Sequence, residues 1–199
     1  FYTLQTMPWV AAETIRRLAP LLCVLIATFV LNEGASPLQW VLLLFSFVGV
    51  AMLQGFETSI EFFPMLVAVV SAVAAACAYT CIRALKGKEA PLTIVFYFPL
   101  VTVPLIAIPT WMSWVPPTPI DWVALVGIGV LTLFAQYTMT AAFQLEPASS
   151  IMPYTYLGPV LAALFGYLLF DETLTPMGWM GVGLVFLSVM LSTTVRQQR

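Results

Sequence analysis

The sequence predicts an all-α integral membrane protein with seven transmembrane helices. Of its 199 residues, 61% are hydrophobic and only 8% are charged, and the mean hydropathy is +1.00. A soluble domain is about a quarter charged, and a disordered chain combines low hydrophobicity with high net charge, so both classes are excluded. The apolar residues also fall into runs of about 20, the length of a helix that crosses the hydrocarbon core.

The first three runs are separated by short polar connections. Helix 9–31 ends at Asn32-Glu33-Gly34, and helix 37–55 opens on a proline and closes on a glycine. Helix 63–85 ends at Lys86-Gly87-Lys88. None of these runs alternates polar and apolar residues as a strand of a membrane β-barrel does, so we expect helices.

The last four runs follow the same pattern. Helices 92–114 and 120–143 flank a loop that contains two consecutive prolines. Helix 148–170 ends at Asp171-Glu172, and helix 176–195 opens on a proline. Because every connection is short and the first run lacks a basic flank, we expect neither a soluble domain nor a cleavable signal peptide.

The few basic residues predict the orientation. Arg83, Lys86 and Lys88 cluster after the third helix, and Arg196 and Arg199 follow the seventh. Four helices separate the two clusters, so both lie on the same side, which the positive-inside rule places in the cytoplasm. We therefore expect a multi-pass protein of the cell (inner) membrane with a cytoplasmic C-terminus.

The composition also excludes several functions. A net charge of −2 without a basic tract removes the electrostatic footprint of nucleic-acid binding. The chain has no histidine, and its three cysteines (Cys23, Cys77 and Cys81) fall inside apolar helices, so we expect no metal site. No nucleophile with a nearby base and no phosphate-binding loop is visible. We expect no enzyme and no cofactor; the partners are the lipid bilayer and a small-molecule substrate.

An internal repeat relates the two ends of the chain. Residues 8–53 match residues 147–192 without a gap, at an offset of 139. The identical pairs are Pro8/Pro147, Leu18/Leu157, Pro20/Pro159, Leu22/Leu161, Leu25/Leu164, Glu33/Glu172, Pro37/Pro176, Trp40/Trp179 and Val50/Val189. Shared apolar composition alone would not align three prolines, a glutamate and a tryptophan, so we interpret the match as a repeat.

The repeat predicts an inverted topology. Helix 9–31 corresponds to helix 148–170, so one copy contains five helices, and successive copies cross the membrane in opposite directions. Such repeats are associated with secondary transporters. We expect residues 1–55 to be the C-terminal part of a truncated first repeat and residues 56–199 to be a complete second one. Three further helices are then expected before Phe1, which gives a ten-helix (5+5) transporter.

Both copies carry Leu-small-Pro in their first helix, Asn/Asp-Glu at its end and Pro-x-x-Trp at the start of the next. The second copy contains Glu146-Pro147-Ala148-Ser149-Ser150-Ile151, Tyr156-Leu157-Gly158-Pro159, Phe170-Asp171-Glu172 and Pro176-x-x-Trp179-x-Gly181. This pattern resembles the EamA-type repeat of the drug/metabolite transporter superfamily over essentially the whole chain. The resemblance implies a permease for small metabolites, amino acids or drugs, with its cavity between the repeats. The alternative is a non-transporting membrane scaffold or subunit.

Helix 9–31 carries three charged residues, Glu13, Arg16 and Arg17, where the resemblance implies small residues. Charges inside a bilayer are costly and are functional candidates by default. The spacing predicts that one arginine pairs with Glu13 and that the other has no partner in its own helix. Two interpretations stay open: an ion pair near the outer interface with snorkelling arginines, or an arginine that lines the cavity and binds an anionic group.

Uncharged polar residues complete the candidate substrate-binding set. Tyr154 and Tyr156 include the repeat partner of Arg17, and they are expected either to face the cavity or to anchor the helix at the interface. Gln136, Tyr137 and Gln144 lie in helix 120–143 or just after it, and buried amides avoid lipid.

Prolines and small residues predict movement and assembly. We expect hinges at Pro20, Pro153 and Pro159, because a proline inside a helix frees a carbonyl and bends the chain. Broken helices at equivalent positions of two repeats point to a transport site. Small-residue faces on helices 63–85 and 176–195 predict close helix contacts and a homodimer. Glu33 and Glu172 recur at helix ends, where we expect them to cap the short turns that follow; a gating or proton-linked role is the alternative.

Overall fold

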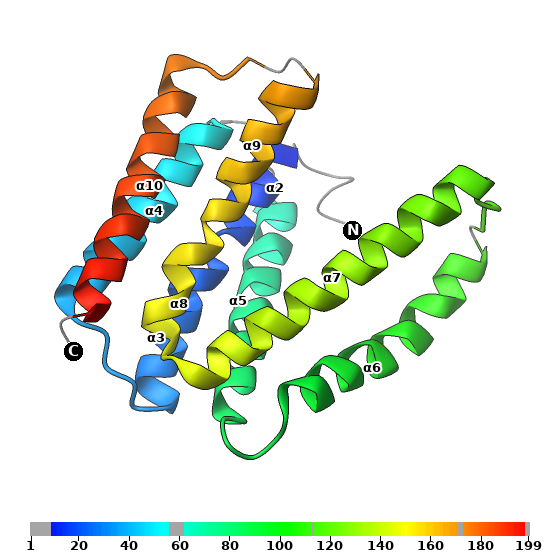
Figure 1. Cartoon of the computed structure of the whole chain (residues 1–199), viewed down its shortest axis with the longest axis horizontal. Coiled ribbons are helices and arrows are strands. Elements are labelled where there is room, and N and C mark those ends of the chain that lie inside the picture. The colour runs from blue at the N-terminus through cyan, green and yellow to red at the C-terminus, as the bar shows by residue number, and fades with distance from the viewer. Residues whose placement is uncertain (1–8, 56–61, 113, 171–172, 198–199) are drawn as a thin grey trace. The chain divides into compact units, whose positions relative to one another are not determined.

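The computed structural model describes residues 9–55, 62–112, 114–170 and 173–197, and every element in these ranges is an α-helix (Figure 1). The helices are α2 (Trp9–Arg16), α3 (Ala19–Val30), α4 (Pro37–Gln54), α5 (Phe62–Ala84), α6 (Pro91–Met112), α7 (Pro119–Leu145), α8 (Ala148–Thr155), α9 (Leu157–Phe170) and α10 (Pro176–Gln197). The all-α prediction is confirmed.

Six stretches of the described chain are long and apolar enough to cross a membrane. They are Pro37–Gln54, Phe62–Ala84, Pro91–Met112, Pro119–Leu145, Ala148–Leu169 and Pro176–Thr194. They match six of the seven expected helices, so the chain is a multi-pass membrane protein. The remaining helix, 9–31, is divided into α2 and α3, so a seventh span stays a prediction.

Contacts divide the chain into two compact units. The first contains the described parts of residues 1–81 and 147–199, and the second contains residues 82–146. The first unit therefore combines α2, α3 and α4 from one copy of the repeat with α8, α9 and α10 from the other. In the second unit, α6 packs against α7.

The most extensive helix contact in the first unit joins α4 and α10, which are equivalent helices of the two copies. They run antiparallel (Figure 1). Their backbones approach so closely that a Cβ atom on Gly49 would lie 2.8 Å from the Gly181 carbonyl oxygen. A Cβ atom on Gly181 would collide with the Gly49 carbonyl oxygen and lie 2.9 Å from the Leu53 nitrogen. Glycine is required here because only hydrogen fits.

The same two helices begin with the same kind of cap. The Ser36 hydroxyl accepts a hydrogen bond from the Gln39 amide at 3.3 Å, and the Gln39 side chain accepts one from the Ser36 amide at 2.9 Å. At the equivalent position before α10, the Thr175 hydroxyl accepts from the Gly178 amide at 3.1 Å. A proline follows each cap, where its missing N–H costs nothing.

Candidate functional site

Two helices of the first unit are broken at equivalent positions. Helix α2 ends at Arg16 and α3 begins at Ala19, while α8 ends at Thr155 and α9 begins at Leu157. The repeat offset makes Arg16 the equivalent of Thr155. Each break precedes a proline that lacks the N–H to bond the carbonyl four residues earlier. These prolines are Pro20 and Pro159, two of the predicted hinges.

The third predicted hinge behaves differently. Pro153 lies inside α8, where it is buried, and the helix continues on both sides of it. The break in this segment follows at Tyr156, three residues later, so it coincides with Pro159 and the repeat rather than with Pro153. Hinge motion at any of the three prolines stays a prediction.

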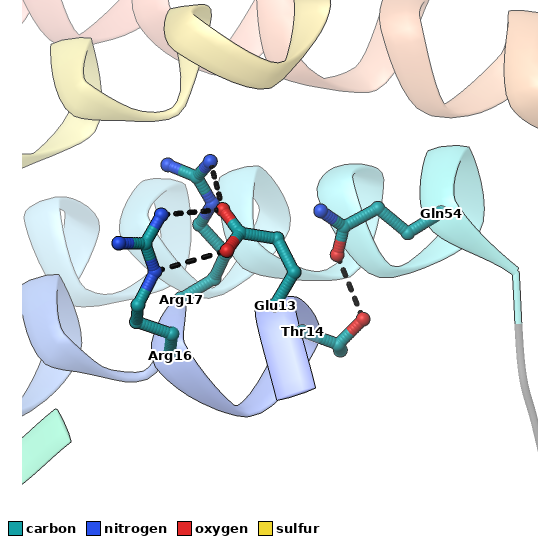
Figure 2. Close-up of polar contacts among 5 residues, drawn as sticks. All are labelled: Glu13, Thr14, Arg16, Arg17 and Gln54. Carbon is teal, nitrogen blue, oxygen red and sulfur yellow. Dashed lines mark hydrogen bonds and ion pairs between the residues drawn. The ribbon is translucent and has the colours of Figure 1, made fainter. Parts of the chain in front are cut away.

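Glu13 and Arg16 of α2 form one cluster with Arg17, which directly follows α2 at the first break (Figure 2). The Glu13 carboxylate accepts two hydrogen bonds from Arg16, from Nε and Nη2, each at 2.9 Å. Its Oε1 atom also accepts one from Arg17 Nη2. The Glu13 and Arg17 side chains are 17% and 25% exposed, whereas that of Arg16 is 63% exposed.

The expectation that only one arginine pairs with Glu13 is wrong. A carboxylate has about four lone-pair positions and can serve two guanidinium groups. The backbone also loosens at this point, because the Arg17 amide is shared between the carbonyls of Glu13 and Thr14, each at 3.1 Å. The two arginines and one carboxylate leave the cluster with a net charge of about +1.

One donor of the cluster is unsatisfied. Arg17 Nε is buried and has no hydrogen-bond partner in the described part of the chain. On the other side of Glu13, the Thr14 hydroxyl donates to Gln54 Oε1 of α4 at 2.7 Å (Figure 2). An unpaired buried donor is costly, so Arg17 Nε marks the point where another acceptor would be most favourable.

Tyr156 joins the two breaks. Its side chain is completely buried, and its hydroxyl donates to the Arg17 carbonyl oxygen at 2.9 Å. The two residues are 139 positions apart, so each is the repeat equivalent of the other. Helices α3 and α8 are in contact and run antiparallel (Figure 1). The Tyr156 hydroxyl is thus hydrogen-bonded to the backbone of the other break. The other predicted tyrosine, Tyr154, is half-buried in α8.

The remaining predicted site residues belong to the second unit. Gln136 and Tyr137 lie in α7, and the Gln144 side-chain amide donates to the Glu89 carbonyl oxygen at 2.8 Å. Their part in substrate binding stays a prediction.

Arg83 is a buried residue whose structural role the sequence did not predict. From the sequence, Arg83 served only to predict which side of the membrane is cytoplasmic. In the structure its Nη1 atom donates hydrogen bonds to the carbonyl oxygens of Phe143 at 2.9 Å and Gln144 at 3.3 Å. A cation at the C-terminal end of a helix is favourable. Its position at the end of helix 63–85 was the available signal.

Glu33 connects the two copies at one end of the first unit. Its Oε2 atom accepts a hydrogen bond from the Ala148 amide, the first residue of α8, at 3.4 Å. A carboxylate is favourable at a helix N-terminus. Glu33 thus binds the start of the equivalent helix of the other copy, and Glu172 lies outside the described residues.

The described residues contain no cluster of three side chains suited to hold a metal ion. Cys23 is buried with its sulfur 3.7 Å from the Thr80 hydroxyl, and Cys77 and Cys81 are exposed.

Comparisons with known proteins identify the family. Residues 62–194 match the EamA-like transporter family. The chain is 32% identical over 200 residues to a pseudopaline exporter of Pseudomonas aeruginosa, covering 98% of this chain and 69% of the exporter. It is 27% identical to an S-adenosylmethionine uptake transporter of Rickettsia prowazekii, covering 86% and 58% of the two chains.

Two further similarities concern a third solute and the fold. The chain is 29% identical to a riboflavin transporter of Vibrio cholerae, covering 82% of this chain and 55% of the relative. The chain also matches a solved crystal structure that is 22% identical in sequence, with a TM-score of 0.87. The match covers 98% of this chain and 71% of the chain in that structure. The family consists of transporters rather than enzymes. This chain belongs to the EamA-like transporter family.

Proposed function

We propose that this protein is a secondary transporter, a permease that moves small solutes by alternating access between two inverted repeats. One observation carries the proposal: the helices that break at equivalent positions of the two copies are antiparallel and are joined at the breaks by the Tyr156–Arg17 hydrogen bond. Broken helices at the interface of inverted repeats are where transporters of this architecture bind their substrates.

The repeats assign the parts of the chain. Residues 1–55 belong to the first repeat, and residues 56–199 form the second, which contains the family match at 62–194. The pair of equivalent helices α4 and α10 then forms the fixed contact between the repeats. The basic residues around 83–88 and at the C-terminus lie on the cytoplasmic side of the cell membrane.

The cluster of Glu13, Arg16 and Arg17 binds an anionic group of the solute. Its net positive charge and the unpaired Arg17 Nε support this role, because an arginine donates two parallel hydrogen bonds to a carboxylate. Three relatives are named for three different solutes, which supports a broad class of small metabolites rather than one compound.

Counterflow in proteoliposomes tests the proposal. The intact protein is reconstituted, loaded with one unlabelled metabolite at a time, and assayed for accumulation of the same compound in radiolabelled form. We expect accumulation for at least one carboxylate-bearing metabolite, and none in protein-free vesicles. Absence of counterflow across a panel of amino acids, nucleosides, vitamins and drug-like cations would favour the scaffold alternative.

A further inference from the structure

The hydrogen bond between the two breaks lacks its symmetric counterpart. The Tyr156 hydroxyl donates to the Arg17 carbonyl oxygen at 2.9 Å. Because Arg17 and Tyr156 are repeat equivalents, the symmetric counterpart of this bond runs from the side chain of residue 17 to the carbonyl oxygen of residue 156. A donor for that bond exists, since Arg17 Nε is buried and has no partner in the part of the chain that the structure describes.

We infer that Arg17 and Tyr156 exchange donor and acceptor roles as the protein changes conformation. In the state described here, the tyrosine hydroxyl donates to the arginine carbonyl. In the oppositely facing state, the Arg17 guanidinium donates to the Tyr156 carbonyl. The inference rests on the proposed transport function, because inverted repeats produce two access states by exchanging the conformations of their copies.

The position of each residue suits this exchange. Arg17 lies between α2 and α3, and Tyr156 is the single residue between α8 and α9, so both carbonyls are at helix junctions. A carbonyl at a junction is free to take a side-chain donor in place of a helical N–H. In this exchange both residues act as positioning residues, because the exchanged bonds join protein groups to each other. The Arg17 Nε atom is available to the solute in the described state, where it is unpaired, and is occupied by the Tyr156 carbonyl in the opposite state.

The exchange also balances the two states. The described state satisfies the Tyr156 hydroxyl and leaves Arg17 Nε unpaired. The opposite state satisfies the arginine and releases the hydroxyl. Each state thus keeps one buried donor without a partner, so neither is stabilised far beyond the other. Two states of similar free energy are what a carrier needs, since a strongly favoured state would trap it.

The relative populations of the two access states are measured by cysteine labelling, without any substrate. Cys23, Cys77 and Cys81 are replaced by alanine in the intact protein, and single cysteines are placed at Ile15 or Tyr154. These two positions are repeat equivalents, both half-buried, in α2 and α8, which reach the breaks from opposite ends of the first unit (Figure 1). A membrane-impermeant maleimide is applied from each side, and the ratio of the two labelling rates reports the state.

Opposite shifts are the expected result. Tyr156→Phe removes the bond of the described state and should change the labelling ratio about fivefold, the effect of one net hydrogen bond. Arg17→Lys keeps the charge, removes Nε and should change the ratio by a similar factor in the other direction. A purely structural role would lower the amount of folded protein without moving the ratio.

A matched control and the flux assay separate the outcomes. Tyr167→Phe in α9 makes the same chemical change as Tyr156→Phe away from the bond between Tyr156 and Arg17, and its ratio should equal that of the unmodified protein. Shifts of Tyr156→Phe and Arg17→Lys in the same direction, or unchanged ratios in both, would overturn the exchange. Absence of counterflow in the unmodified protein contradicts the proposed transport instead, whatever the ratios.

Discussion

At the residue scale, the net charge of the cluster of Glu13, Arg16 and Arg17 decides which chemical groups it can bind. One carboxylate, Glu13, is shared by two guanidinium groups, so one positive charge has no counterpart within the cluster. An isolated charge in or near the hydrocarbon core is expensive, and the cost falls when an anionic partner binds. The cluster is therefore better suited to accept a carboxylate than to repel one.

Neutralising either arginine tests this role. We expect Arg16→Gln and Arg17→Gln to reduce uptake of anionic or zwitterionic solutes about tenfold or more, because a hydrogen bond to a charged group contributes about 1.5–3 kcal/mol. Insertion into the membrane should stay normal. Lys88→Gln, an exposed cation of the second unit, is the matched control and should transport normally. Unchanged uptake in both arginine variants would reassign them to interfacial anchoring.

The sequence predicted part of this site. Spacing identified Glu13 as a partner for an arginine, and the repeat identified Arg17 and Tyr156 as equivalents. It did not predict that both arginines share the carboxylate, because helical spacing brings both within reach of Glu13 without showing that one carboxylate serves two guanidinium groups. Nor did it predict the bond from the Tyr156 hydroxyl to a carbonyl, which requires two antiparallel helices to meet at their junctions.

At the element scale, the local sequence predicted where the membrane segments lie but not where their helices break. The segments 9–31 and 148–170 were each expected to form one helix, and each forms two. Their prolines were recognised, but a proline in an apolar segment does not show whether the helix bends or breaks. Periodicity therefore located the membrane segments and could not show where hydrogen bonding along them stops.

Restoring the missing N–H groups tests the hinges. We expect Pro20→Ala and Pro159→Ala to slow counterflow severalfold, because the new amide can bond the carbonyl of Arg16 or Thr155 and straighten the helix. Pro91→Ala is the control, since Pro91 opens α6, where an amide has no helical partner anyway. Unchanged rates in both hinge variants would identify these prolines as static kinks.

The α4–α10 contact gives a stability prediction with its own control. Gly181→Ala places a Cβ against the Gly49 carbonyl and the Leu53 amide, so we expect a loss of about 1–3 kcal/mol through overpacking. Gly183→Ala meets nothing within 4 Å and should be neutral or slightly stabilising, because alanine favours helices. Thermal unfolding in detergent measures both, and equal melting temperatures for the two variants would contradict the close packing.

At the scale of the whole molecule, the first compact unit is built from both ends of the chain. This unit takes helices from both repeat segments, and the equivalent helices α4 and α10 lie side by side and antiparallel (Figure 1). The predicted homodimer through small-residue faces stays a prediction, because Gly181 is used within the chain while Gly183 has open space around it.

The inverted topology makes the last prediction. Helices α4 and α10 begin at opposite ends of the first unit (Figure 1). Gly34 and Thr173, which precede them, are repeat equivalents, so an inverted repeat places them on opposite sides of the membrane. In the cysteine-free protein, a membrane-impermeant maleimide added to intact cells should label Thr173→Cys and spare Gly34→Cys and Gly87→Cys, because the basic loop at 86–88 is cytoplasmic. Labelling of Gly34→Cys and Thr173→Cys from the same side would contradict the inversion, whereas a full exchange of the pattern would contradict only the orientation.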